Sequence, residues 1–219
     1  MKDALPQTIY LKDYKVPPFL IETTDLVFDL GEQQTCVTSS LAVRRNPASA
    51  EQSGSLELNS KGDVQLQWVE IDGQRLNDSD YTLSDNMLTL SNLPTSCVIT
   101  TEVRIQPQLN TSMMGLYRSR TMYCTQCEAE GFRRITYFPD RPDIMSIFTV
   151  KIVADKASYP ILLSNVNAIS RSDLEGGRHS ITWHDPFKKP SHLFALVAGT
   201  LAVVEDSFTT VSGREIPLQ

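Results

Sequence analysis

The sequence predicts an all-β fold, a saddle-like or β-sandwich domain of mainly antiparallel strands. Apolar and polar residues alternate with a period of two along much of the chain, as they do in strands with one buried face. Turn dipeptides, Asp72-Gly73 and Gly176-Gly177, lie inside two of these runs. No stretch of about 12 residues or more has helical spacing between caps, which excludes βαβ units and a doubly wound parallel sheet. Two layers of antiparallel strands remain.

The expected strands follow in chain order. Residues 26–30 and 37–43 place apolar or small side chains at alternate positions. A hairpin is expected at 64–76, because Asp72-Gly73 supplies the positive φ angles of a tight turn. The other expected strands are β-branched or apolar runs bounded by turn residues, at 97–106, 146–154, 172–185 (a hairpin around Gly176-Gly177) and 193–206.

Two segments break the alternation and are expected to be loops. Pro, Gly, Ser and Asn interrupt the pattern at 46–55 and 107–120. The final segment, 207–219, begins a new hairpin-like pattern around Ser212-Gly213 and stops at Gln219. This ending is typical of a further domain that has been cut.

Charge and hydropathy bound the classes of partner. The 219 residues carry 20 Lys and Arg against 26 Asp and Glu, a formal net charge of −6. Such a surface repels phosphate backbones and anionic lipids on average, so we expect no nucleic-acid partner. The run of about 18 apolar residues that a membrane helix requires is absent, so we expect no membrane partner. Residues 1–20 carry charges where a secretory signal has its apolar region, which favours a cytoplasmic protein.

Four cysteines are too few for a disulfide-stapled scaffold, and we expect them to be thiols. Cys36 and Cys97 lie in strand-like runs and are interpreted as small buried hydrophobic residues. Cys124 and Cys127 form a CxxC motif, which raises the alternatives of a redox pair and half of a zinc site. A redox pair requires a following helix, and a zinc site requires two more ligands at matched spacing. Neither is present, so packed thiols are favoured.

The histidines His179, His184 and His192 lie in or beside expected strands, without a triad or nucleophile elbow around them. We interpret them as solvated or core-edge side chains. The sequence contains no GxxxxGK, GxGxxG or HExxH. We therefore expect no catalytic set and no metal site within this chain.

Polar chemistry concentrates at 124–143, CTQCEAEGFRRITYFPDRPD. Carboxylates and arginines this close together most often form ion pairs that hold a loop. A second hypothesis is that Gln126 and Glu128, two residues apart on a β-like segment, point the same way and converge on one ligand. That ligand would be a cation with several N–H donors, such as a peptide α-amine with a pKa of about 8.

This segment resembles the amine-anchoring segment in the N-terminal domain of zinc aminopeptidases of the aminopeptidase N type, especially their bacterial branch. Three flanking stretches resemble that domain in the same order: GLYRS (115–119), FTVKIVADKASYPILLSN (148–165) and DPFKKPSHLFALVAG (185–199). DRPD (140–143) differs from the CFDEP-like form of animal members. The resemblance covers nearly the whole chain.

The resemblance implies that residues 1–200 form a saddle-shaped β domain and that 201–219 are the first strands of a thermolysin-like catalytic domain. Gln126 and Glu128 match the Gln-x-Glu pair that holds the free α-amino group of a peptide substrate. Residues implied to shape and support that loop are Arg133, Arg134, Asp140, Arg141 and Asp143.

The implied activity is that of a broad-specificity aminopeptidase that removes N-terminal residues from peptides. Its zinc would be held by an HExxH motif and a distal Glu outside these residues, so the chain alone is expected to be inactive. Implied partners are peptide substrates and the chain's own catalytic domain. The alternative is a free-standing β-sandwich binding module that uses the 124–143 loop to hold a partner or peptide terminus.

Overall fold

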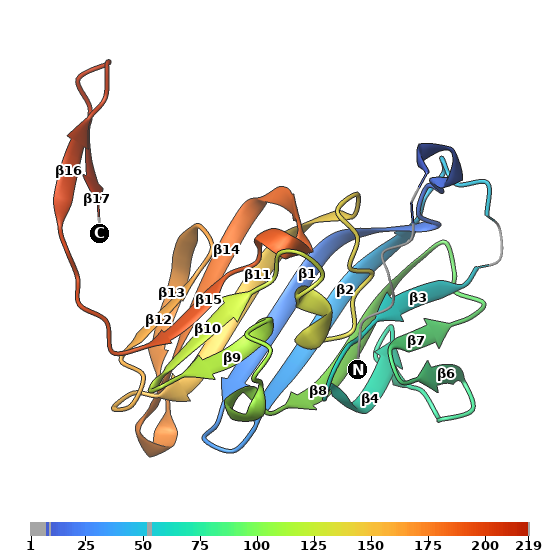
Figure 1. Ribbon diagram of the computed structural model, residues 1–219, viewed down its shortest axis with the longest axis horizontal. Coiled ribbons are helices and arrows are strands. Elements are labelled where there is room, and N and C mark those ends of the chain that lie inside the picture. Colours follow the sequence, from blue (N-terminus) through green and yellow to red (C-terminus); the bar gives the residue numbers. More distant parts are fainter. Residues whose placement is uncertain (1–7, 9, 52–53, 219) are drawn as a thin grey trace.

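The computed structural model describes residues 8, 10–51 and 54–218, and its main layer is a twisted eight-stranded sheet (Figure 1). Its strands lie in the order β13, β14, β11, β1, β2, β8, β4, β5. In that order they span Asn167–Asp173, Arg178–Pro190, Met145–Asp155, Phe19–Leu30, Thr35–Arg45, Ser96–Ile105, Gln65–Ile71 and Gln74–Arg75. Neighbouring strands are antiparallel except β1 and β11, which pair in parallel from Thr23↔Ile147 to Asp29↔Val153.

Two smaller antiparallel sheets cover one face of the large sheet (Figure 1). The first has the order β12, β15, β10, β9, with strands at Ile161–Ser164, Leu196–Gly199, Met122–Gln126 and Gly115–Ser119. The second has the order β3, β7, β6, with strands at Leu56–Asn59, Met87–Leu90 and Tyr81–Ser84. Buried side chains of all three sheets form one hydrophobic core. This arrangement confirms the predicted all-β, mainly antiparallel fold.

Helical structure in the described part of the chain is confined to single 3₁₀ turns. They are η1 (Leu11–Asp13), η2 (Pro107–Leu109), η3 (Phe132–Arg134), η4 (Glu175–Gly177) and η5 (Ser191–Leu193). Within the same residues, no helix has the length and apolarity needed to cross a bilayer.

Aromatic rings fasten the polar segment 124–143 to the large sheet. Phe132 of η3 meets Phe138 edge-on with ring centroids 5.0 Å apart and meets Phe194 at 5.3 Å. Phe194 stacks on Phe28 of β1 at 5.7 Å, and Phe148 of β11 lies 6.1 Å from Phe132. Each of these rings is almost fully buried. Edge-to-face and offset aromatic pairs add to the free energy of burial, so the polar loop stands on a rigid base.

Three predicted hairpins are confirmed. The 64–76 hairpin is β4–β5, and Asp72 and Gly73 both have positive φ in its turn. The 172–185 hairpin is β13–β14, with η4 forming its connection. The 207–219 pattern is the hairpin β16 (Asp206–Thr209) and β17 (Glu215–Leu218), which projects from the body (Figure 1); residue 219 lies outside the described residues.

Two expectations from the sequence are wrong in part. Residues 107–120 contain the strand β9 besides loop, because Gly115 at φ +73° redirects the chain to pair with β10. Residues 193–206 form one strand at 196–199, since pairing with β12 ends at Gly199, and only Asp206 at the end of the range belongs to another strand, β16. Beyond Gly199, Val203 and Val204 are exposed and the chain runs to β16 without regular structure.

Candidate functional site

The polar segment leaves the four-stranded sheet through a tight turn. Strand β10 ends at Gln126, and the Gly131 N–H donates to the Cys127 carbonyl at 2.8 Å. The Glu128-Ala129 peptide bond is cis, and Glu130 has φ +62°. A Cβ on Gly131 would lie 2.4 Å from the Gln126 carbonyl oxygen, so only glycine fits at this position. We call residues 126–131 the anchor loop.

Gln126 and Glu128 lie side by side at the start of the anchor loop, and both are exposed. The Gln126 amide donates from Nε2 to the backbone carbonyl of Glu128 at 3.0 Å. No group within residues 8, 10–51 and 54–218 donates to the Glu128 carboxylate. From the sequence we expected both residues at alternate positions of one β-like segment. That expectation is wrong, because strand β10 ends at Gln126 and the chain turns there. The turn nevertheless holds the amide against the main chain of Glu128 and leaves the carboxylate open.

A cavity of about 180 Å³ opens beside Glu128. We call it the loop cavity, and its lining residues are Glu128, Ala129, Glu130, Asp140, Arg141, Pro142 and His192. Glu130 and Arg141 also border a larger cavity of about 460 Å³, which extends toward residues 15–19. Glu128 therefore lies at the edge of a space that a small group can enter.

Asp140 is the centre of the polar network beneath the anchor loop. Its carboxylate is almost fully buried and accepts from the Arg133 backbone N–H and Nε, each at 3.1 Å, and from Ser191 Oγ at 2.5 Å. Arg133 Nη2 donates to the Asp140 carbonyl at 2.9 Å, and Asn59 Oδ1 accepts from the Asp140 N–H at 3.2 Å. Asp140 thus joins η3 and η5 through its carboxylate and β3 through its backbone N–H. Glu130, 65 % exposed, lies 3.4 Å from Arg133 and adds a weak ion pair.

Arg141 and Asp143 brace the outer part of the segment. Arg141 donates from Nε and Nη2 to the two Asp143 oxygens at 2.9 and 2.7 Å, and Nη2 also reaches the Lys15 carbonyl. This fork and a hydrogen bond from Tyr14 hold the pKa of Asp143 below its usual range. Arg133 and Asp140 therefore hold one another in place, and Arg141 and Asp143 form a second such pair. The Arg134 guanidinium makes no hydrogen bond or ion pair within the described part of the chain.

The cysteines have the environment of packed thiols. Cys127 is 2 % exposed, and burial strongly raises the pKa of its thiol. Burial also raises the pKa of Cys124, whereas a reactive CxxC cysteine has a lowered thiol pKa. Across residues 8, 10–51 and 54–218, no group of three or more His, Cys, Asp or Glu could hold a metal ion. These residues do not fit a zinc site, and we assign them no metal ligand.

We expect Cys127 and Cys97 to resist a thiol reagent near neutral pH in the folded protein. Only the thiolate attacks such reagents, and burial raises the pKa of Cys97 to about 11 and that of Cys127 further from its usual value. Ellman titration at about pH 7.5, with and without denaturant, measures this. Denaturation should release all four free thiols. A fast-reacting thiol with a pKa below about 7 at Cys124 or Cys127 would restore the redox hypothesis.

The histidines have separate partners. His179 is buried and donates from Nε2 to the Tyr159 carbonyl at 2.8 Å, while His184 Nδ1 lies 3.2 Å from Thr149 Oγ1. His192 lines the loop cavity. The sequence alone gave no reason to place His192 near Glu128, because the two residues are distant along the chain and meet only through η5.

A family model described as the peptidase M1 N-terminal domain matches residues 30–193. The chain belongs to this family. Aminopeptidase N of Caulobacter vibrioides is 49 % identical over 219 residues, which cover 100 % of this chain and 25 % of that protein. Aminopeptidase N of Escherichia coli is 47 % identical over 218 residues, which cover 98 % of this chain and 24 % of that protein. This M1 domain therefore spans about a quarter of the length of these relatives.

Solved structures agree with this assignment. Aminopeptidase A of Legionella pneumophila, in complex with aspartic acid, superposes with a TM-score of 0.89 at 34 % identity, over 94 % of this chain and 24 % of that one. An M1 zinc metallopeptidase from Deinococcus radiodurans, solved with a Tyr-Ser-Ala substrate, gives a TM-score of 0.72 at 15 % identity, over 91 % of this chain and 46 % of that one. The second likeness concerns the fold alone. The chain is homologous to the N-terminal part of aminopeptidase N, an M1 zinc metallopeptidase.

Proposed function

We propose that this chain is the substrate-anchoring domain of a broad-specificity zinc aminopeptidase that removes N-terminal residues from peptides. Gln126 and Glu128 bind the free α-amino group of the substrate. The zinc and its ligands belong to a catalytic domain outside these residues. The observation that carries the proposal is Glu128, an exposed residue that lines the loop cavity and whose carboxylate has no partner among the described residues.

A carboxylate in this position suits an ammonium group. An α-amine has a pKa of about 8, and a carboxylate that faces it favours its charged form. Hydrogen bonds between charged groups are worth more than neutral ones, and they gain strength when a second domain excludes water from the site. Gln126 fixes the anchor loop through its bond to the Glu128 carbonyl, and its own amide oxygen stays available to an N–H donor.

Anchoring the amine explains why an exopeptidase would cut after one residue. If the substrate's first nitrogen is held at Glu128, the next carbonyl lies at a fixed distance from it. Binding energy is then spent on orientation, which lowers the barrier for the bond at that carbonyl alone. In this proposal Glu128 positions the substrate and does not serve as the base.

The chain also supports the proposed division at residue 200. Residues 200–205 have no regular structure, and Val203 and Val204 are exposed. They separate the hairpin β16–β17 from the three-sheet body (Figure 1). We propose that residues 1–200 form the anchoring domain and that 201–219 begin the thermolysin-like catalytic domain, whose surface would cover the exposed apolar side chains of this segment.

The test compares Glu128→Gln with Glu130→Gln in the full-length enzyme. Both residues are exposed carboxylates of the anchor loop, but Glu130 is paired with Arg133 and has no assigned ligand role. Losing a charged hydrogen bond of about 1.5–3 kcal/mol should lower kcat/KM for an aminoacyl arylamide roughly 10- to 100-fold in Glu128→Gln. The Glu130→Gln value should stay near that of the wild type.

A desamino analogue of the same arylamide isolates the interaction with the amine. The wild-type enzyme should cleave this analogue slowly, and Glu128→Gln should cleave it no more slowly, because no amine is left to lose a partner. Bound zinc, measured by metal analysis, should be equal in all three proteins. Equal kcat/KM for Glu128→Gln and Glu130→Gln on the free-amine substrate would reject the anchor assignment.

A further inference from the structure

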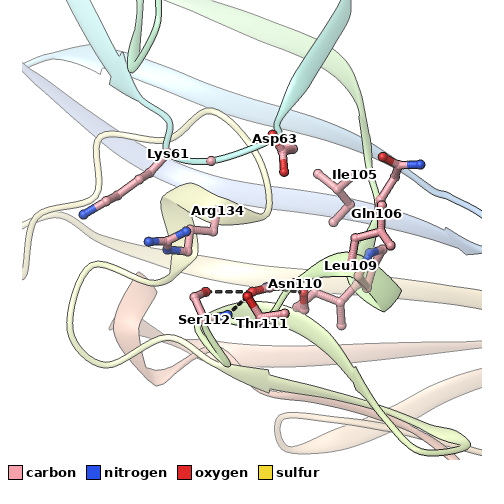
Figure 2. Close-up of a pocket in the computed structure, with 12 residues that line it drawn as sticks. Lys61, Asp63, Ile105, Gln106, Leu109, Asn110, Thr111, Ser112 and Arg134 are labelled. Carbon is pink, nitrogen blue, oxygen red and sulfur yellow. Dashed lines mark hydrogen bonds between the residues drawn. The ribbon is translucent and has the colours of Figure 1, made fainter. Parts of the chain in front are cut away.

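A second polar pocket, of about 170 Å³, lies next to η3 on the side of the β3–β4 connection (Figure 2). It is formed by residues 61–63, by Ile105 at the end of β8, by residues 106–107 and 109–112 of the connection to β9, by Leu116 and by Arg134. None of these residues belongs to the anchor loop or to the loop cavity. The proposed amine site therefore does not account for this pocket.

Arg134 in this pocket differs from its neighbour Arg133. Arg133 pairs with Asp140 and Glu130 through Nε and Nη2, and its side chain is 17 % exposed. The guanidinium of Arg134 has no acceptor in the described part of the chain, although its residue is half-buried. An arginine presents five N–H donors in a rigid fork that matches an oxyanion. Arg134 therefore offers an unfilled fork within a concave surface.

Two glycines make room for the Arg134 side chain. Gly62 has φ +80°, and a Cβ there would lie 3.2 Å from Arg134 Nη1. Gly115 has φ +73°, and a Cβ there would lie 2.7 Å from Arg134 Cβ. The side chain is thus packed against main chain at both ends. Such a preorganised fork loses little conformational entropy when it binds a ligand.

The surrounding charges favour an anion. The Lys61 amine has no partner among the residues that the structure describes, and its side chain and that of Arg134 extend to the same side of the pocket (Figure 2). Asp63 lies on the other side and pairs with neither cation. The pocket is therefore net positive in a chain whose net charge is −6. The apolar side chains of Ile105, Leu109 and Leu116 on its wall lower the local dielectric constant. The attraction between these cations and a bound anion is therefore stronger than in water.

The polar groups of the neighbouring loop are mostly committed to one another. Asn110 donates to the carbonyls of Met114 and Leu116 and accepts from Ser112 N–H and Oγ. Asn110 and Ser112 thus build the wall of the pocket, and the Thr111 hydroxyl beside them is a further donor.

We propose that this pocket binds a small oxyanion, a phosphate or carboxylate group, between the Arg134 fork and the Lys61 amine. The volume admits an anion of this size with its bridging waters and no large ligand. Because Arg134 directly follows Arg133 in η3, an anion here lies behind the anchor loop without contacting Gln126 or Glu128.

The test is calorimetric titration of the full-length protein with inorganic phosphate and, separately, with succinate, at low ionic strength. The wild type should bind at least one of them, and the tighter one identifies the chemistry of the ligand. Arg134→Gln should weaken binding about tenfold or more, since a charged hydrogen bond is lost. Lys61→Gln, at an exposed position that cannot disturb the core, should weaken it in the same direction.

Two further variants separate a site from a general effect of charge. Arg214→Gln removes the same charge from the exposed turn between β16 and β17 and should leave the affinity unchanged. Asp63→Asn removes the opposing carboxylate and should tighten binding. The proposal fails if the wild type binds neither anion at about 10 mM, or if Arg134→Gln and Arg214→Gln weaken binding equally. Either result leaves the Glu128 proposal untouched.

Discussion

Gly131→Ala should destabilise the fold and abolish the proposed amine anchoring together. The added Cβ would lie 2.4 Å from the Gln126 carbonyl oxygen and 2.7 Å from the Cys127 Cα. Both neighbours are main-chain atoms, so no side-chain rotation relieves the overlap. The turn must open and lose the 2.8 Å bond from Gly131 N–H to the Cys127 carbonyl. Overpacking of a rigid site costs about 1–3 kcal/mol, and we expect the upper end of that range here.

Thermal unfolding and kcat/KM of the full-length enzyme measure the two consequences. A loss of about 3 kcal/mol corresponds to a fall in Tm of roughly 6–12 °C for a domain of this size. Gly176→Ala is the matched control, because Gly176 has φ +70° but a Cβ there would meet nothing within 4 Å. It should cost only the backbone strain of about 1–2 kcal/mol and leave kcat/KM unchanged. Equal effects of the two substitutions would show that the close approach at Gly131 is unimportant.

Asp140→Ala should destabilise the domain by about 3 kcal/mol, because it leaves the half-buried Arg133 guanidinium without its main counter-charge. The carboxylate is 3 % exposed and the Arg133 side chain 17 % exposed, so water cannot replace the lost partner fully. The Arg133 N–H and the buried Ser191 hydroxyl lose their acceptor as well. Chemical denaturation should show the loss as a lower midpoint with an unchanged m-value.

The control for Asp140 is an exposed ion pair. Asp173 pairs with Lys156 on the surface, where both side chains are more than half exposed, so Asp173→Ala should leave the midpoint unchanged. An equal loss of stability in Asp173→Ala would mean that the change in net charge, and not the burial of the ion pair, accounts for the Asp140 effect. The double variant Asp140→Ala with Ser191→Ala should cost less than the sum of the single changes, because the two share one hydrogen bond.

Local patterns were sufficient to predict the class of fold. The hairpins at Asp72-Gly73 and Ser212-Gly213 need a positive φ angle in their turns. The glycine-containing dipeptides predict this, because glycine adopts positive φ readily. The period of two located β1, β2 and β8, because each buries one face. The parallel pairing of β1 with β11 was not predictable in this way, since its register joins segments that are distant along the chain.

The amine-binding role of Gln126 and Glu128 stays a prediction. Their spacing suggested a shared ligand, and the resemblance then identified that ligand as a substrate amine. The turn that follows Gln126 depends on Glu130, a residue other than glycine at positive φ, which no local rule singles out. The sequence also gives no distinction between the adjacent arginines, because their different roles arise from Asp140 on one side and from Gly62 and Gly115 on the other.

The parallel pair has a consequence for synthesis of the chain on the ribosome. β1 can pair with β2 as soon as both have emerged, but its other edge waits for β11, from Thr23↔Ile147 onward. At about 5–20 residues per second, that edge stays uncovered for roughly 6–25 s. Phe28 remains without its final cover during this interval, because Phe194, which stacks on it, is translated later still. The nascent protein therefore carries an open strand edge that a chaperone or a neighbouring nascent chain can reach before the sheet is complete.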